Sequence, residues 1–140
     1  MIVLDTNMIS ESVKEQPDAN LALWMQQISE ADLFLCDIVM MELSFGAERF
    51  RQRTGSERYL RMLTDLQTLF SDRIVNLSLD SAILSGKVRA RREGTGRPIS
   101  VSDAMIAAIC LHNGAALATR NVKDFEGLDL RLVNPFEGAR

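Results

Sequence analysis

Short apolar runs alternate with longer segments of helical periodicity, and this pattern restricts the possible folds more than any other feature of the chain. The apolar runs predict β-strands at residues 2–5, 32–37, 73–77, 115–119 and 130–134. A strand with apolar residues on both faces must be covered from both sides, which parallel sheets achieve with the helices that connect their strands. We therefore expect a three-layer α/β/α fold with a central, mainly parallel sheet and the run 130–134 at its edge.

The segments between these runs predict the helices. Apolar residues recur every three or four positions over residues 6–30, 38–53, 56–70, 80–92 and 101–112. Asp18 and Asp80 are the expected N-caps of two of these helices, because a short carboxylate accepts hydrogen bonds from free backbone N–H groups. The glycines and the proline of residues 93–98 predict a loop.

Length and composition indicate an ordinary globular protein. The 140 residues suit one domain, expected to span 1–140, and 46% apolar and 25% charged residues are typical values. No apolar stretch is long enough to cross a membrane and the first residues lack a signal peptide's features, so we expect a cytoplasmic protein. Cys36 and Cys110 are too few for a disulfide framework and suit a reducing compartment as buried free thiols.

The scarcity of histidine narrows the chemistry that the chain can perform. His112 is the only histidine, whereas zinc sites and hydrolytic triads mostly depend on this residue. Cys36, Cys110 and His112 stand at no recognised ligand spacing, so a zinc site is not expected. Carboxylates must therefore carry out any polar chemistry.

Polar residues follow two of the predicted strands directly. Asp-Thr-Asn (5–7) follows the first strand, and Thr-Arg-Asn (119–121) follows the strand at 115–119. Ligands of open parallel sheets bind beyond the carboxyl ends of the strands, so both places are candidate sites. The alternative for Asp5 is an N-cap at a strand-to-helix turn. Within the first motif we expect Asp5 to contribute most, Thr6 next and Asn7 least.

Glu42 is a third unusual polar residue. Its helical neighbours at three and four positions are Ile38, Val39, Phe45 and Gly46, so the carboxylate is predicted to lie within an apolar stripe. No Lys or Arg stands at those spacings, and burial of an unpaired carboxylate costs several kcal/mol. The two explanations are an arginine distant in sequence or a bound cation.

Asp103 also begins an apolar stripe, which continues through Ile106, Ala107 and Cys110. Its alternative role is in a capping box with Ser100 as the N-cap.

Asp5, Glu42 and Asp103 can all point toward one region near the strand ends. Two charges about 5 Å apart repel by roughly 3 kcal/mol at an effective dielectric near 20, so three acids gathered there need a cation. Oxygen ligands without histidine favour Mg²⁺ or Mn²⁺.

Four motifs in this order resemble one known family. They are VLDTN (3–7), the helix segment MEL-x-x-G (41–46), GRPISVSDAMIAA (96–108) and LATRNVKDF (117–125). Together they resemble the PIN-domain ribonucleases, and among these the VapC toxins of bacterial type II toxin–antitoxin pairs, in the FitB-like branch. The resemblance covers the whole chain and implies the PIN-like form of the α/β/α fold.

The resemblance also implies an activity, a Mg²⁺- or Mn²⁺-dependent endoribonuclease. Asp5 and Asp103 would be direct metal ligands, Glu42 would complete the cluster or hold a water on the metal, and Thr6 would steady the Asp5 carboxylate. Attack by water leaves a 5′-phosphate and a 3′-hydroxyl.

The fourth acidic position of many PIN domains is less clear in this sequence. It lies after the strand that ends here at Thr119, where this chain has Asn121 and, three residues later, Asp124. We place Asn121 in the site as a neutral ligand or hydrogen-bond donor, with Asp124 and Thr119 supporting it.

Substrate and partners follow from the same resemblance. The substrate is RNA, with transfer RNA a frequent target of the family, and the partners are a VapB- or FitA-type antitoxin and a second copy of the chain. The net charge is −3, but ten of the sixteen basic residues lie in two short stretches, namely Arg49, Arg51, Arg53, Arg58 and Arg61, and Lys87, Arg89, Arg91, Arg92 and Arg97. These stretches are either basic flanks of an acidic site or solvated helix faces. Arg97 and Arg120 are the expected phosphate contacts.

Two other functions compete with this hypothesis. A phosphatase of the haloacid dehalogenase type also begins with an apolar strand ending in Asp, but it needs a second acid where this chain has Asn7. A non-enzymatic acidic interaction domain does not explain an unpaired Glu42 in an apolar stripe.

Overall fold

A five-stranded parallel sheet forms the centre of the computed structural model, which describes residues 1–138. The strands are β1 (Ile2–Leu4), β2 (Leu33–Cys36), β3 (Ile74–Val75), β4 (Ala116–Ala118) and β5 (Leu132–Val133). Their order is β3-β2-β1-β4-β5, and every neighbouring pair is parallel. The predicted parallel sheet and the edge position of the last strand are both confirmed.

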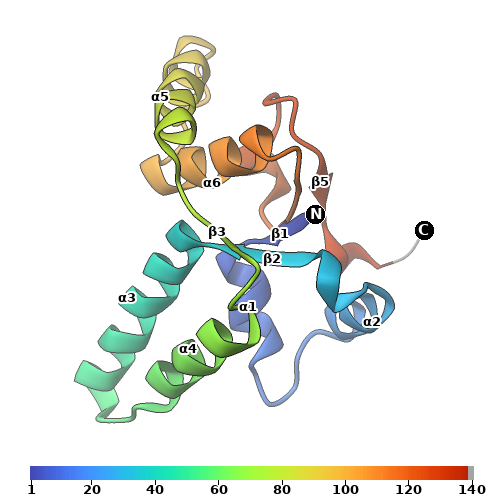
Figure 1. Ribbon diagram of the computed structural model, residues 1–140, viewed down its shortest axis with the longest axis vertical. Coiled ribbons are helices and arrows are strands. Elements are labelled where there is room, and N and C mark those ends of the chain that lie inside the picture. The colour runs from blue at the N-terminus through green and yellow to red at the C-terminus, as the bar shows by residue number, and fades with distance from the viewer. Residues whose placement is uncertain (139–140) are drawn as a thin grey trace.

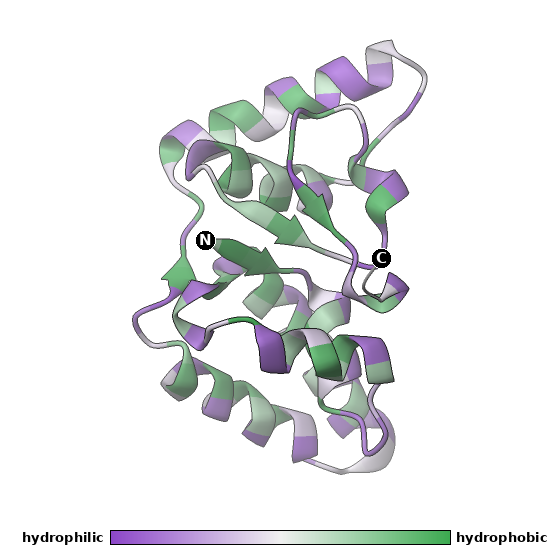
Figure 2. Cartoon of the chain, turned by 90° about the vertical axis from the view of Figure 1, so that its right-hand side faces the viewer, coloured by the Kyte–Doolittle hydropathy of each residue, from purple (hydrophilic) through white to green (hydrophobic). Residues whose placement is uncertain are grey.

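Six helices cover the sheet and complete the predicted three-layer α/β/α fold (Figure 1). They are α1 (Thr6–Ser12), α2 (Ala19–Gln27), α3 (Asp37–Thr54), α4 (Arg58–Leu69), α5 (Leu79–Gly94) and α6 (Val101–His112), and three short 3₁₀ turns are η1 (Glu30–Asp32), η2 (Val122–Phe125) and η3 (Pro135–Glu137). α5 and α6 lie on one face of the sheet, and α1, α3 and α4 lie on the other (Figures 1 and 2). The region predicted to be helical over residues 6–30 contains two helices, because the segment that contains Pro17 separates α1 from α2.

Of the two N-caps predicted for α2 and α5, the structure confirms the first and contradicts the second. Asp18 caps α2 by accepting a hydrogen bond from the Leu21 N–H at 3.1 Å, as predicted. The predicted cap Asp80 is wrong, since the Ser78 hydroxyl oxygen caps α5 through the Ser81 N–H at 3.1 Å. Asp80 lies instead in the first turn, where its negative charge suits the positive end of the helix.

The core lies between the sheet and its two helical layers. β1, β2 and β4 contribute mostly buried apolar side chains, and α6 is buried from Ile106 through Cys110. The central strands are coloured mainly as hydrophobic in Figure 2. Cys36 and Cys110 are buried free thiols, as predicted. Within residues 1–138, no helix combines the length and the apolar character that a membrane crossing requires.

The direction of the chain across the sheet identifies the place for a site. From β1 the chain moves outward through β2 and β3, and it then returns to the other side of β1 with β4. The carboxyl ends of β1 and β4 therefore lie at the topological switch point of the sheet. Leu4 is paired with Ala118, and the Asp5 N–H donates to the Ala118 carbonyl at 2.9 Å. The two polar motifs that follow these strands are thus neighbours.

Candidate functional site

Asp5 lies at the centre of this switch point and is 5% exposed. Its Oδ1 accepts a hydrogen bond from the Thr6 N–H at 2.8 Å, so the residue is the N-cap of α1. Its Oδ2 accepts from the Thr119 hydroxyl at 2.8 Å and from the Asn7 amide at 3.2 Å. Asp5 is therefore both a helix cap and a buried acid, and three donors fix its orientation.

Asn7 connects the turn after β1 to the turn after β4. Its Nδ2 donates to Asp5 and, at 3.4 Å, to the Thr119 hydroxyl oxygen, while its Oδ1 accepts from the Arg120 N–H at 3.1 Å. The Thr119 hydroxyl oxygen also accepts from the Asn121 N–H at 3.0 Å. Asn7 thus makes more contacts within the motif than its predicted rank suggests, and it positions the Asp5 carboxylate from both sides of the switch point.

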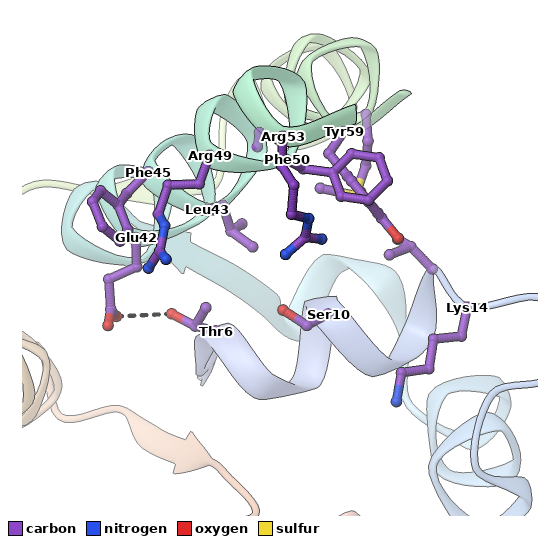
Figure 3. A pocket seen from close by; sticks show the side chains of 14 residues that line it. Thr6, Ser10, Lys14, Glu42, Leu43, Phe45, Arg49, Phe50, Arg53 and Tyr59 are labelled. Atoms are coloured by element: carbon purple, nitrogen blue, oxygen red, sulfur yellow. Dashed lines mark hydrogen bonds between the residues drawn. The ribbon is translucent and has the colours of Figure 1, made fainter. Parts of the chain in front are cut away.

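Thr6 and Glu42 are joined across α1 and α3. The Thr6 hydroxyl donates to Glu42 Oε1 at 2.8 Å (Figure 3). The stripe around Glu42 is less buried than predicted, because Phe45 is 64% exposed and Gly46 is exposed as well. No ion pair among residues 1–138 includes Glu42, so a salt bridge to a distant arginine does not explain it. The carboxylate lies half-buried at the rim of a groove.

Asp103 approaches the same region from the first turn of α6. Its N–H donates to the Ser100 hydroxyl oxygen at 3.1 Å, which confirms Ser100 as the N-cap. Burial and then the charges of Asp5, Asp124 and Glu42 raise the pKa of Asp103 to about 6, against a smaller opposing effect of Ser100. The carboxylate is therefore a partner in a capping motif and also a member of a crowded group of acids.

The buried Asp5 carboxyl is also perturbed. Burial raises its pKa, the hydrogen bonds from Thr119, Thr6 and Asn7 lower it, and the charge of Asp124 raises it. Asp5 and Asp103 thus interact electrostatically with one another and with Asp124. Such clusters of raised carboxyl pKa values are typical of functional sites.

The two candidates for the fourth polar position, Asn121 and Asp124, both follow β4 but differ in their interactions. Asn121 is exposed, and within residues 1–138 its side chain makes no hydrogen bond, although its N–H binds Thr119. Asp124 lies on η2, close enough for its charge to act on both Asp5 and Asp103. The acid, rather than the amide, therefore takes part in the electrostatics of the cluster.

Arg92 holds the turn that carries Asp124. This arginine is 6% exposed, and its guanidinium donates to the carbonyls of Arg97 at 2.7 Å, Asp124 at 3.0 Å and Glu126 at 3.1 Å. The expectation of a basic surface at Arg92 is therefore wrong, because its side chain is buried and its guanidinium donates to backbone oxygens. Arg89 and Arg91, which precede it, are also basic, so the sequence does not distinguish Arg92 from them.

The two expected phosphate contacts, Arg97 and Arg120, have different partners in the protein. Arg97 is exposed and forms an ion pair with Glu126 at 3.2 Å. The guanidinium carbon of Arg120 lies 4.5 Å from the ring centroid of Phe136. Arg97 is thus paired with an acid, whereas Arg120 forms no ion pair among residues 1–138.

The donor set suits a hard divalent cation, although the geometry is open. No three or more His, Cys, Asp or Glu side chains within residues 1–138 converge on a common metal position. The groups that interact are oxygen donors, whereas burial raises the pKa of the Cys36 thiol to about 12 and thus disfavours the thiolate that zinc requires. Mg²⁺ is normally bound by one or two carboxylates plus waters and substrate phosphates, so an open cluster of this kind fits it.

Comparison with known proteins agrees with the geometry. Residues 2–129 match the PIN domain family. The chain is 32% identical over 142 residues to the VapC ribonuclease Y4jK of Sinorhizobium fredii, with 99% of this chain and 100% of the relative covered.

Solved structures are similar over nearly the whole chain as well. The structure of FitAcB from Neisseria gonorrhoeae has a TM-score of 0.84 and 27% identity, with 97% of this chain and 99% of that chain covered. A toxin–antitoxin complex from Klebsiella pneumoniae has a TM-score of 0.71 and 25% identity, with coverage of 96% and 98%. On the fold, the acidic switch point and these full-length similarities, the chain belongs to the PIN-domain family, and within it to the VapC toxins of toxin–antitoxin systems.

Proposed function

We propose that this toxin is a Mg²⁺-dependent endoribonuclease that hydrolyses RNA phosphodiester bonds at the carboxyl ends of β1 and β4. The observation that carries the proposal is the mutual effect of the acids, since the charges of Asp5, Asp124 and Glu42 all raise the pKa of Asp103. Acids that repel one another in the free protein gain stability from a cation among them. Relatives of the chain are named ribonucleases, which supports RNA as the substrate.

The residues of the site have distinct parts in this proposal. Asp5 and Asp103 would hold the ion directly, with Glu42 completing the site. When bound, Mg²⁺ would polarise a phosphoryl oxygen, lower the pKa of the attacking water and offset the developing negative charge. Thr6 orients Glu42 through its hydroxyl, and three donors hold the Asp5 carboxylate still.

Asp124 is our candidate for the fourth acid of the site. It affects both proposed direct ligands electrostatically, and the buried Arg92 fixes its backbone through the Asp124 carbonyl at 3.0 Å. Asn121 remains a candidate for contact with substrate, because its amide is exposed beside the cluster.

The phosphatase alternative is disfavoured by the contacts of Asn7. A phosphatase of the haloacid dehalogenase type needs a general acid at this position, whereas the Asn7 amide donates to Asp5 and Thr119 and its oxygen accepts from the Arg120 N–H. The side chain therefore holds the two turns together and has no free proton to supply to a leaving group. The non-enzymatic alternative does not explain why the fold places Asp103 where its pKa is raised.

We propose an antitoxin and a second copy of the chain as partners. A toxin–antitoxin complex is among the full-length structural neighbours, which supports an antitoxin that covers the acidic site.

Self-association is supported by α5, where Leu79 is 77% exposed and Ile83, one turn later, is 52% exposed. Ile83→Glu should shift a dimer toward monomer in size-exclusion chromatography with light scattering, whereas the exposed Gln67→Glu should not.

Cleavage by the purified toxin, freed of antitoxin, tests the proposed activity. It should cut RNA with Mg²⁺ or Mn²⁺, lose activity with a chelator, and leave 5′-phosphate ends that a 5′-phosphate-dependent exonuclease recognises. Asp5→Asn should reduce the rate at least about 100-fold, because it removes a direct ligand. Cleavage that survives this change, or that proceeds without a divalent ion, would show that the proposed mechanism is wrong. Hydrolysis of small phosphate esters with intact RNA would instead favour the phosphatase.

A further inference from the structure

A groove of about 560 Å³ runs between α1, α3 and α4 and opens beside the Thr6–Glu42 hydrogen bond (Figure 3). Its wall includes Thr6, Lys14, Glu42, Gly46, Arg49 and Arg53. We propose that this α1–α3–α4 groove binds single-stranded RNA and guides it into the acidic cluster. The inference rests on the proposed ribonuclease activity and adds to it the form of the substrate and the path by which it reaches the site.

The charge of the groove is opposite to the charge of the protein. Lys14, Arg49 and Arg53 give three positive charges and Glu42 gives one negative, a difference of +2 in a chain of net charge −3. Lys14 is paired with Glu11 at its outer rim, whereas Arg49 and Arg53 form no ion pair among residues 1–138. A local positive field of this kind attracts a phosphate backbone despite the negative overall charge.

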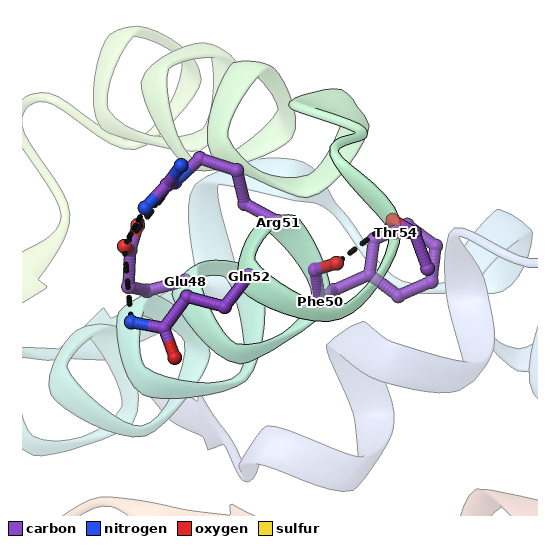
Figure 4. Close-up of polar contacts among 5 residues, drawn as sticks. All are labelled: Glu48, Phe50, Arg51, Gln52 and Thr54. Atoms are coloured by element: carbon purple, nitrogen blue, oxygen red, sulfur yellow. Dashed lines mark hydrogen bonds and ion pairs between the residues drawn. The ribbon is translucent and has the colours of Figure 1, made fainter.

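Unpaired arginines occur on only one of the two α3 faces that carry Arg49, Arg51 and Arg53. Arg51 points away from the groove, where Glu48 accepts its Nε–H at 3.0 Å, and Glu48 also accepts from Gln52 (Figure 4). The acid thus neutralises the arginine on the outer face and leaves the two groove arginines as the cations available to a ligand.

The spacing of the charged residues along α3 forms a path. Arg49 and Arg53 follow Glu42 by seven and eleven positions, which are close to two and three helical turns, so the three side chains lie on one face. Figure 3 shows both arginines reaching from α3 across the groove toward α1. At about 1.5 Å per residue, the arginines start roughly 10 Å from the Glu42 position and are about 6 Å apart along the axis. A strand that contacts both is therefore directed at the Thr6–Glu42 pair.

Aromatic side chains beside these arginines suit unpaired bases. Phe45 is 64% exposed, and the Arg49 guanidinium carbon lies 5.5 Å from its ring centroid. Deeper in the groove, Phe50 packs edge-on against Tyr59 at 4.8 Å, with Arg53 5.5 Å from the Phe50 centroid. Proteins that bind single strands without reading a sequence stack the bases on aromatic rings and contact the backbone with neighbouring basic side chains.

Gly46 keeps the middle of the groove open. It lies one turn after Glu42 on the same face, and a Cβ built at this position meets no atom within 4 Å. The backbone does not need glycine there, since Gly46 is an ordinary helical residue without a positive φ. A larger side chain would therefore fill the groove without disturbing the core.

The test measures binding by fluorescence anisotropy, with a labelled ten-nucleotide RNA in the presence of a chelator so that no cleavage occurs. Arg49→Ala and Arg53→Ala should each weaken binding about 5- to 10-fold, and each should lower the slope of log affinity against log salt by about 0.7. The matched control is Arg131→Ala, at the far end of the sheet beside Gly114, which should change the affinity less than 2-fold. Duplex RNA of the same sequence should bind at least about 10-fold more weakly than the single strand.

A second pair of variants separates loss of binding from loss of folding. Gly46→Ala should melt at or above the wild-type temperature and bind RNA normally, whereas Gly46→Phe should keep its circular dichroism spectrum and bind at least about 10-fold more weakly. Equal RNA binding by wild type, the arginine variants and Gly46→Phe would overturn the inference. So would a groove that binds an acidic amphipathic peptide but no RNA.

The outcome also distinguishes this inference from the proposed activity. If the wild type cleaves RNA with Mg²⁺ and the groove variants bind as well as wild type, only the groove assignment is wrong. If the wild type binds single-stranded RNA through the groove but leaves it intact with Mg²⁺, the proposed activity fails.

Discussion

Asp103→Asn should stabilise the metal-free protein while abolishing its activity. The structure raises the pKa of Asp103 from 3.8 to about 6, mainly by burial and by the charge of Asp5. At neutral pH the folded chain must hold this carboxylate charged in an unfavourable place. A pKa of about 6 in place of 3.8 corresponds to about 3 kcal/mol. Partial solvent exposure of the side chain reduces this to about 1–2 kcal/mol.

The sign of the pH dependence follows from proton linkage. Because the folded-state pKa is raised, the native protein keeps the Asp103 proton between about pH 4 and pH 6, where the unfolded chain has lost it. The wild type is therefore penalised fully above pH 6 and progressively less as the pH falls toward 4. Asparagine has nearly the same shape without the charge, so the advantage of Asp103→Asn should be largest near pH 7 and should shrink toward pH 4.

Thermal unfolding with a chelator at pH 7, 6, 5 and 4 measures this effect. For a chain of this length, 1–2 kcal/mol corresponds to a rise in melting temperature of roughly 3–8 °C. Asp65→Asn is the matched control, because Asp65 is exposed on α4 outside the acidic cluster, and its melting temperature should change by less than about 1 °C. Saturating Mg²⁺, at about 100 times its Kd, should add about 2.7 kcal/mol to the wild type and much less to the variant. An Asp103→Asn protein that melts no higher than wild type at pH 7, or whose advantage persists at pH 4, would refute the repulsion argument.

Three further variants test the groups that position the acids. Thr6→Val removes the hydroxyl that binds Glu42 and should slow RNA cleavage about 10-fold, and Thr6→Ser should restore most of the rate in the same assay. Asn7→Ala should lower the stability by about 1–3 kcal/mol in urea unfolding, because Asp5 and Thr119 lose a shared donor. Arg92→Met should lower it by about 2–4 kcal/mol in the same measurement, because three partly buried carbonyls lose their donor.

The sequence predicts the parallel sheet and the two polar strand ends well because both depend on local patterns. Apolar runs of strand length and helical periodicity are read within a few residues, and they place Asp5 and Thr119 at the carboxyl ends of two strands. The structure adds that these two strands are neighbours at the switch point. The role of Ser100 as the N-cap of α6 is equally local. The predicted caps fail only for α5, where Ser78, two residues earlier, competes with Asp80 for the same end of the helix.

The sequence does not predict features that join distant segments. Arg92 stands among basic residues and is predicted to be exposed, but it is buried because carbonyls from residues 97, 124 and 126 converge on it. The predicted apolar stripe around Glu42 is only partly covered by the rest of the protein. The uncovered part lines a groove that is open to solvent. Helical periodicity tells which residues share a face, but not whether another element covers that face.

The two proposed direct ligands differ in how the fold treats their charge. Asp5 is nearly inaccessible and burial raises its pKa, but three donors from both sides of the switch point partly offset this effect and hold the carboxylate in place. Asp103 has the Ser100 cap as its main compensation and faces the charges of three other acids. In the proposed site, the fold fixes one carboxylate by hydrogen bonds and leaves the other facing like charges, so a cation bound between them would relieve that repulsion. A gain in stability on binding Mg²⁺ would then come mostly from Asp103, while Asp5 and the Asn7–Thr119 link would set the geometry of the site.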